Sequence, residues 1–156
     1  MSDNLVEIIP DLWLSDNHSL FNNINNYSFL DLVQINCDKE LDFIGKSKKY
    51  KDTDIKQNLQ KYEIIKFYKY LFTSIEFIYQ NIKRNKSVIV HCLKGDQLSP
   101  SIVVAYLIKY GKMTATNAIH LIKSKSDIAF KGGIDFIFPL DKFEADLRFN
   151  KEIYSF

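Results

Sequence analysis

The sequence predicts an α/β domain in which helices flank a central, mostly parallel sheet. Short β-branched runs alternate with longer segments whose apolar residues recur every three or four positions. This alternation favours a parallel sheet, because each helix returns the chain to begin the next strand. No repeat, low-complexity tract or Pro/Gly/Ser-rich linker divides the chain, and 156 residues can bury a substantial core. We therefore expect one domain over residues 1–156.

The first part of the chain contains the shorter predicted elements. They are, in order, a strand after Pro10 at DLWLSD (11–16), a helix at SLFNNINNY (19–27) and a strand at FLDLVQINC (29–37). Cys37, at the end of the second strand, is expected to be inert core. The polar segment 38–58 allows one short strand, at residues 50–55.

The longest predicted helix begins near Ile65. Its apolar residues form the stripe of an amphipathic helix packed on a sheet: Phe67, Leu71, Ile75, Ile78 and Ile82. The β-branched run SVIV, residues 87–90, follows it and predicts a buried strand at the centre of the sheet.

Three further helices are predicted after this strand, and capping residues mark their ends. Ser99 as N-cap and Pro100 as the first helical residue begin one helix, which ends at Gly111 as the C′ residue. Thr114 is expected to cap the next helix. FPLDKFEADLRF, residues 138–149, forms the last.

Composition argues against several classes of protein. A net charge of +2 gives little reason to expect nucleic acid as a partner, and no apolar run is long enough to span a membrane. The first ten residues lack the basic start and apolar core of a signal peptide. Two cysteines make no disulfide framework, so we expect a reducing compartment, the cytoplasm or also the nucleus. His18 and His120 have no metal-ligating partners at useful spacing, so no metal and no cofactor is expected.

The segment HCLKGDQLS, residues 91–99, carries the clearest chemical signal. A buried strand, a His-Cys pair, a tight turn containing Gly95 and then a helix are how a cysteine phosphatase presents its nucleophile. The thiolate of Cys92 would attack phosphorus, and a helix N-terminus helps such a thiol to ionise. Backbone N–H groups of the turn would hold the phosphate oxygens.

The same segment lacks the cation that this chemistry requires. Six residues after Cys92, where an Arg would clamp two phosphate oxygens, the chain has Leu98. Asp96 adds a carboxylate that would repel a phosphate dianion. Lys94 could compensate in part, but its ammonium is a point charge and cannot reproduce the planar guanidinium.

These residues resemble the dual-specificity protein phosphatases, the compact branch of the cysteine-dependent phosphatases. The family loop is His-Cys, five variable residues including Gly, Arg, then Ser or Thr. The chain matches it at His91, Cys92, Gly95 and Ser99 and departs at Leu98. Four further segments resemble parts of the family: IIPDLWLSD (8–16), LDLVQINC (30–37), AYLIKYGKMTATNAIHLIKSK (105–125) and FPLDKFEADL (138–147).

The resemblance implies the dual-specificity-phosphatase fold and a set of site residues. Cys92 takes the nucleophile position, with Ser99 after it, and His91 braces the loop. The phosphate-binding loop comprises His91, Leu93, Lys94, Gly95, Asp96, Gln97 and Leu98. The resemblance also implies an Asp general acid on a loop before the cysteine. The corresponding stretch Ile55–Tyr62 contains no acidic residue, although Asp54 and Glu63 flank it and a loop shift would bring one of them into place.

Without the Arg and a clear general acid, we expect the domain not to be an enzyme. The leading hypothesis is a catalytically inactive member, a pseudophosphatase that binds a protein or phosphoprotein. A second hypothesis is a weak phosphatase that uses Cys92 with Lys94 as an unorthodox cation. A third is an interaction protein whose pocket is vestigial and whose binding face lies elsewhere.

Overall fold

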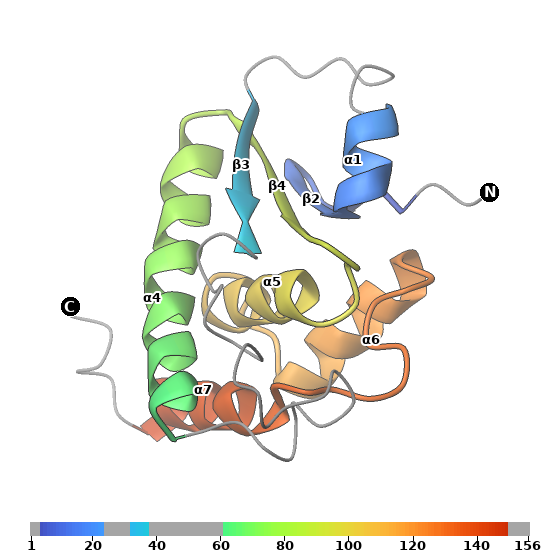
Figure 1. The fold of residues 1–156 in the computed structure, drawn as a ribbon. Helices are drawn as coiled ribbons and strands as arrows, with labels where there is room; N and C mark the ends of the chain where they lie inside the picture. The colour runs from blue at the N-terminus through green and yellow to red at the C-terminus, as the bar shows by residue number, and fades with distance from the viewer. Residues whose placement is uncertain (1–3, 24–31, 38–60, 150–156) are drawn as a thin grey trace.

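The structure, a computed structural model, describes residues 4–23, 32–37 and 61–149, which form a four-stranded sheet with helices packed against it (Figure 1). The strands are β1 (Val6–Ile9), β2 (Leu12–Asp16), β3 (Leu32–Asn36) and β4 (Ser87–Cys92). The described helices are α1 (Asn17–Asn23), α4 (Lys61–Lys83), α5 (Leu98–Lys109), α6 (Ala115–Lys125) and α7 (Ile137–Phe149). The strand order is β1-β2-β4-β3; β4 is parallel to both neighbours, and β1 is antiparallel to β2. The prediction of an α/β fold with a mostly parallel sheet is confirmed.

Strand β4 has helices over both of its faces, so its residues point alternately to two apolar clusters. Val88, Val90 and Cys92 belong to the large core shared with α4 and α5, whereas Ile89 belongs to a smaller cluster that includes Leu20 of α1. Successive side chains of a strand point to opposite faces. The end of β4 therefore directs Cys92 towards α5 and His91 towards α1.

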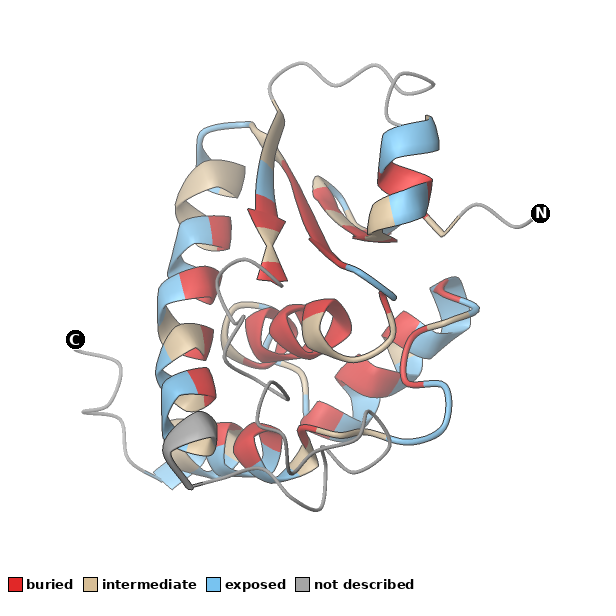
Figure 2. Cartoon of the chain, viewed as in Figure 1, coloured by how far each residue is buried: buried red, intermediate tan, exposed pale blue. Residues whose placement is uncertain are grey.

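Helix α5 lies at the centre of the domain and is buried on nearly all sides (Figure 2). Its residues 99–108 are all buried, and it contacts β4 and β2 of the sheet as well as α4, α6 and α7. Helix α4 covers one side of α5 with the predicted apolar stripe. Four members of that stripe are fully buried and Ile82 is partly buried, the four being Phe67, Leu71, Ile75 and Ile78.

Polar and aromatic contacts join α4 to the C-terminal end of α5. The rings of Tyr79 and Tyr110 stack with their centroids 4.0 Å apart, and the Tyr110 hydroxyl donates a hydrogen bond to the Glu76 carboxylate. This hydrogen bond lowers the pKa of Glu76, while burial and the same bond raise the pKa of Tyr110. The Lys109 ammonium lies 3.9 Å from the Glu76 carboxylate. These contacts fix the two helices against each other at this end.

The N-terminal elements differ from the prediction at two points: α1 begins at Asn17, before the predicted start at Ser19, and a strand was missed. The predicted strand 11–16 is β2, but β1 precedes it as an antiparallel partner that the sequence analysis did not include. Asp11 adopts a left-handed φ of 69°, which Asp tolerates better than most residues, and the chain turns there into a hairpin. Cys37 is fully buried in the core, as predicted. Residues 24–31 of the predicted helix and strand, and the predicted strand 50–55, lie outside the described residues.

The start of α5 also differs from the prediction. The sequence suggested Ser99 as N-cap, but Gln97 is at the N-cap position and the helix begins at Leu98. The side chain of Gln97 makes no capping hydrogen bond. The Ser99 hydroxyl instead contacts the sulfur of Cys92, a tertiary partner that local capping rules do not include.

Two other predicted helix ends are confirmed, whereas α4 begins at Lys61, four residues before the predicted start near Ile65. Thr114 is the N-cap of α6, and its hydroxyl accepts a hydrogen bond from the Asn117 N–H at 3.1 Å. Gly111 follows the last residues of α5 in the C′ position, and a Cβ there would lie 2.7 Å from the Leu107 carbonyl oxygen. Close approach of the chain to the helix end therefore requires glycine.

We predict that Thr114→Ala lowers the free energy of unfolding by about 1 kcal/mol, because the first turn of α6 loses its side-chain acceptor. Urea unfolding followed by circular dichroism measures this change. Thr116→Ala is the matched control, because Thr116 is exposed and is the second residue of α6. It should change the free energy of unfolding by no more than about 0.5 kcal/mol. Equal effects of the two substitutions would contradict the capping role.

Candidate active site

The sulfur of Cys92 lies where β4 ends and α5 begins, surrounded by hydrogen-bond donors. The N–H of Gly95 is 3.2 Å from the sulfur and the N–H of Ser99 is 3.5 Å from it. The Ser99 hydroxyl is 3.1 Å away, and Cys92 is only 3% exposed. Hydrogen bonds directed at sulfur favour the thiolate over the thiol.

The N-terminus of α5 reinforces this environment. The first N–H groups of a helix have no partner within the helix, and they carry its positive end. In α5 the N–H of Ser101 bonds to the Gln97 carbonyl, and Pro100 has no N–H to donate. The N–H of Ser99 instead points to the Cys92 sulfur. Two backbone N–H groups and one hydroxyl therefore meet at the Cys92 sulfur.

His91 lies on the opposite face of β4 and is held by α1. Its Nδ1 is 2.7 Å from the side-chain oxygen of Asn17, and because that oxygen can only accept, Nδ1 carries the proton. The backbone N–H of Asn17 also donates to the Leu93 carbonyl, at 3.4 Å. Asn17 therefore braces both the histidine and the start of the loop. Sequence reasoning missed it, since no local motif marks a residue so far along the chain from His91.

The turn after Cys92 depends on Gly95. Its φ is +70°, a left-handed value that favours glycine. A Cβ at this position would lie 2.8 Å from Cδ1 of Ile128 and 3.0 Å from both Cβ and N of Asp16. The turn is thus packed between the end of β2 and the segment after α6, with no room for a side chain.

Hydrogen bonds tie the second half of the loop to the segment between α6 and α7. The side-chain amide of Gln97 donates to the Gly133 carbonyl and its oxygen accepts from the Asp135 N–H, both at 2.9 Å. The carbonyl of Asp96 accepts from the Phe130 N–H at 2.8 Å. Gln97, which the sequence analysis placed in the loop by position alone, therefore fixes the loop to a distant part of the chain.

Leu98 is the first residue of α5, and its side chain packs against the main core. It is partly buried, as are Asp96 and Gln97, whereas Lys94 is exposed and Leu93 is 65% exposed. The structure therefore places the predicted site residues from Cys92 to Ser99 around one turn, whereas His91 lies on the opposite face of β4. At the position assigned to the Arg, that turn presents only aliphatic carbon.

The predicted general-acid region lies almost wholly outside the described residues. This applies to Asp54 and to residues 55–60, while residues 61–63 begin α4. Among the described residues, two groups outside the loop hold it in place. Asn17 of α1 bonds to His91, and the segment 128–135 bonds to Gln97.

Comparisons with known proteins identify the family to which the chain belongs. A family model described as "Dual specificity phosphatase, catalytic domain" matches residues 13–146. Dual specificity protein phosphatase 1 of Arabidopsis thaliana is 34% identical over 87 residues, which cover 56% of this chain and 43% of that protein. The solved structure of human DUSP28 has a TM-score of 0.67 at 14% identity, covering 95% of this chain and 97% of that one. Human tyrosine phosphatase-like serine/threonine/tyrosine-interacting protein has a TM-score of 0.65 at 18% identity, covering 94% and 99%.

The chain belongs to the dual specificity phosphatase catalytic domain family, because the family model spans most of its length. The two solved structures share its fold. The chain spans less than half the length of the Arabidopsis relative, at 43%. None of the helices in the described ranges is long and apolar enough to cross a membrane.

We predict that Gly95→Ala destabilises the domain more than Gly132→Ala. Both glycines have positive φ, so each substitution should cost about 1–2 kcal/mol in left-handed strain. Only Gly95 would place its Cβ against other atoms, since a Cβ at Gly132 meets nothing within 4 Å. Overpacking should add about 1–3 kcal/mol at Gly95. Chemical denaturation measures both variants, and equal losses would show that the turn has room to adjust.

Proposed function

We propose that this domain is a pseudophosphatase, which binds a protein or phosphoprotein and does not hydrolyse phosphate esters at the rate of an enzyme. Leu98 carries the proposal. It stands six residues after Cys92, where the family loop has Arg, and its side chain has no hydrogen-bond donor and packs against the core. The site can present a thiolate, but it lacks the group that would hold the transferred phosphoryl oxygens.

The expected loss of reaction rate is large enough to make the domain inactive. An Arg clamp makes two charge-assisted hydrogen bonds worth about 1.5–3 kcal/mol each, so its absence removes on the order of 10²–10⁴ in rate. The stretch Ile55–Tyr62, which contains no acidic residue, would remove on the order of a further 10²–10⁴ if no flanking acid serves. Together these losses leave little beyond the background reaction.

Two further observations argue against turnover of phosphate esters. Asp96 places a carboxylate in the loop, where it opposes a phosphate dianion. One protein of the same fold is described as phosphatase-like and as an interacting protein. A reducing compartment such as the cytoplasm or nucleus suits a domain whose site contains a cysteine thiol.

A second candidate function is a weak cysteine-dependent phosphatase. The intact set of donors around the Cys92 sulfur favours it, because a prepared thiolate is not needed for binding alone. Lys94, exposed in the loop, would supply the positive charge without the planar geometry of Arg. Turnover of an aryl phosphate separates the two candidates, since a good leaving group does not depend on the general acid.

We predict that the purified domain hydrolyses aryl phosphates and phosphotyrosine peptides no faster than its Cys92→Ser variant. Leu98 cannot stabilise the transition state, and no acidic residue lies in Ile55–Tyr62 to protonate the leaving group. Steady-state assays with both proteins at matched concentration test this. Cys92-dependent turnover at about 1 s⁻¹ or above would contradict the pseudophosphatase proposal and support the weak enzyme.

We also predict that Leu98→Arg, combined with Asp96→Ala to remove the opposing carboxylate, restores anion binding more than catalysis. The guanidinium should regain a good part of the roughly 3–6 kcal/mol expected from two charge-assisted hydrogen bonds. Aryl phosphates should then show measurable Cys92-dependent turnover, while phosphoserine peptides stay near background. Vanadate titration and the two assays measure this.

The Asp96→Ala variant alone is the control for the loss of the carboxylate. If the double variant folds like the wild type yet neither binds vanadate nor turns over an aryl phosphate, position 98 is not the Arg position of a phosphatase loop. That result would remove the observation on which the proposed function depends.

A further inference from the structure

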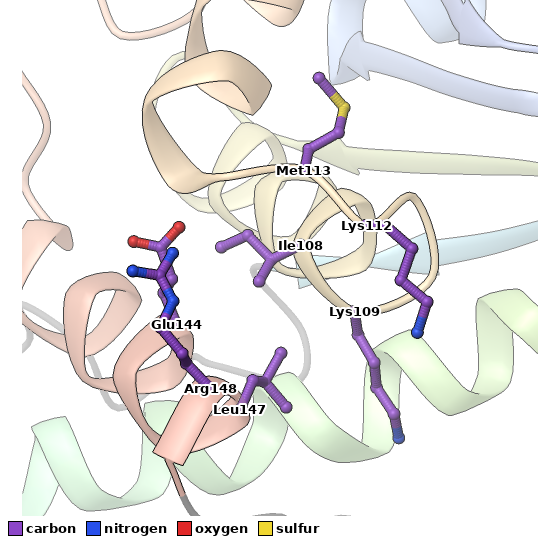
Figure 3. Close-up of a pocket in the computed structure, with 7 residues that line it drawn as sticks. All are labelled: Ile108, Lys109, Lys112, Met113, Glu144, Leu147 and Arg148. Atoms are coloured by element: carbon purple, nitrogen blue, oxygen red, sulfur yellow. The ribbon is translucent and has the colours of Figure 1, made fainter.

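A groove of about 490 Å³ lies at the opposite end of α5 from the Cys92 loop (Figure 3). It is formed by the last turn of α5, the connection to α6 and the last turns of α7. No residue of the predicted phosphate site lines it. A ligand in this groove would therefore leave the Cys92 loop uncovered.

The floor of the groove is apolar. Ile108, Met113 and Leu147 line it, and all three pack with the main core while contributing surface to the groove. Phe149, which ends α7 directly after the lining residue Arg148, is 80% exposed. An apolar floor of this kind can bury one large aliphatic or aromatic side chain of a ligand.

Two cations flank this floor, Lys112 from the α5–α6 connection and Arg148 from α7 (Figure 3). Both are exposed, and neither forms an ion pair with another described residue, although Figure 3 shows the Glu144 side chain next to Arg148, one turn away on α7. The other charged lining residues already have partners. Lys109 contacts Glu76, and the Glu144 carboxylate accepts a hydrogen bond of 2.5 Å from the Ala115 N–H at the start of α6.

Helix ends explain only part of this charge. A cation in the last turn of a helix interacts favourably with the negative end of the helix dipole, which accounts for Lys109 and Arg148. Lys112 lies outside both helices and has a left-handed φ of 56°, where Gly or Asn would be less strained. The helix dipole therefore does not account for a lysine at this point of the groove rim.

We propose that this groove binds an acidic segment of a partner protein, with one large apolar side chain flanked by carboxylates. The apolar side chain lies against Ile108, Met113 and Leu147. The carboxylates pair with Lys112 and Arg148, whose positive charges are the complement that selects an acidic partner. The site is separate from the Cys92 loop, so the inference goes beyond the proposed function and does not depend on whether Cys92 is active.

Fluorescence anisotropy with a labelled peptide of sequence Glu-Asp-Glu-Leu-Phe-Glu-Asp-Glu tests the proposal on the full chain. Lys112→Glu with Arg148→Glu should weaken binding by about tenfold or more, because two attractive pairs become repulsive. Lys123→Glu with Lys125→Glu changes the net charge by the same amount at two exposed positions of α6 and should weaken binding by no more than about twofold. Cys92→Ser should bind like the wild type, which separates this test from that of the proposed function. Circular dichroism verifies that each variant is folded.

Peptide composition provides the second part of the test. Replacing the acids by Gln and Asn, or Leu-Phe by Ala-Ala, should each reduce the affinity by about tenfold or more. Equal losses in the two charge-reversal variants would mean non-specific attraction and overturn the proposal, as would undetectable peptide binding. If sedimentation shows that the wild type is a dimer and that the double variant Lys112→Glu with Arg148→Glu is a monomer, a second copy of the chain occupies the groove. That result would also overturn the proposal. Tighter peptide binding after deletion of residues 150–156 would make the chain's own C-terminus the competitor and would likewise overturn the assignment to a partner protein.

Discussion

The meeting of the α5 N-terminus with the sulfur of Cys92 is the contact on which the site depends. Helix α5 is buried along most of its length, so the unpaired N–H groups of its first turn need an acceptor inside the protein. The Cys92 sulfur accepts from the N–H of Ser99, and the turn at Gly95 supplies a second N–H. The alternation of side chains along β4 directs the sulfur to this position and sends His91 to the other face. The end of one strand and the start of one helix thus determine the surroundings of the Cys92 sulfur.

The contacts that hold the loop in its conformation are different from the groups that would bind and transfer a phosphate. The loop is held by packing around Gly95, by the two hydrogen bonds of Gln97 and by the contacts of Asn17. None of these groups needs a phosphate or an Arg to keep its place. A leucine at position 98 even adds apolar contact with the core. A member of this family can therefore lose its phosphate clamp without losing the loop, which is the physical basis of the proposed function.

Much of the fold could be predicted from local pattern, and the site only in part. The apolar stripe of α4 and the cap at Thr114 are properties of short segments, and the loop was found from the spacing between His91 and Ser99. The N-cap prediction for Ser99 failed because its hydroxyl contacts a sulfur brought close by the tertiary fold. The roles of Asn17 and Gln97 have the same cause, since each bonds to residues far away in the sequence. Such contacts leave no periodic or spacing signal.

The proposed function requires that the Cys92 sulfur does not react with phosphate esters. Rapid mixing with a phosphorus-labelled aryl phosphate, followed by acid quench, measures formation of the phosphocysteine directly. This measurement does not depend on a general acid, because an aryl leaving group needs little protonation. It also does not depend on release of the product. We expect the label retained by the wild type to equal that of Cys92→Ser. Stoichiometric labelling that depends on Cys92 would contradict the account and show that the loop transfers phosphate without an Arg.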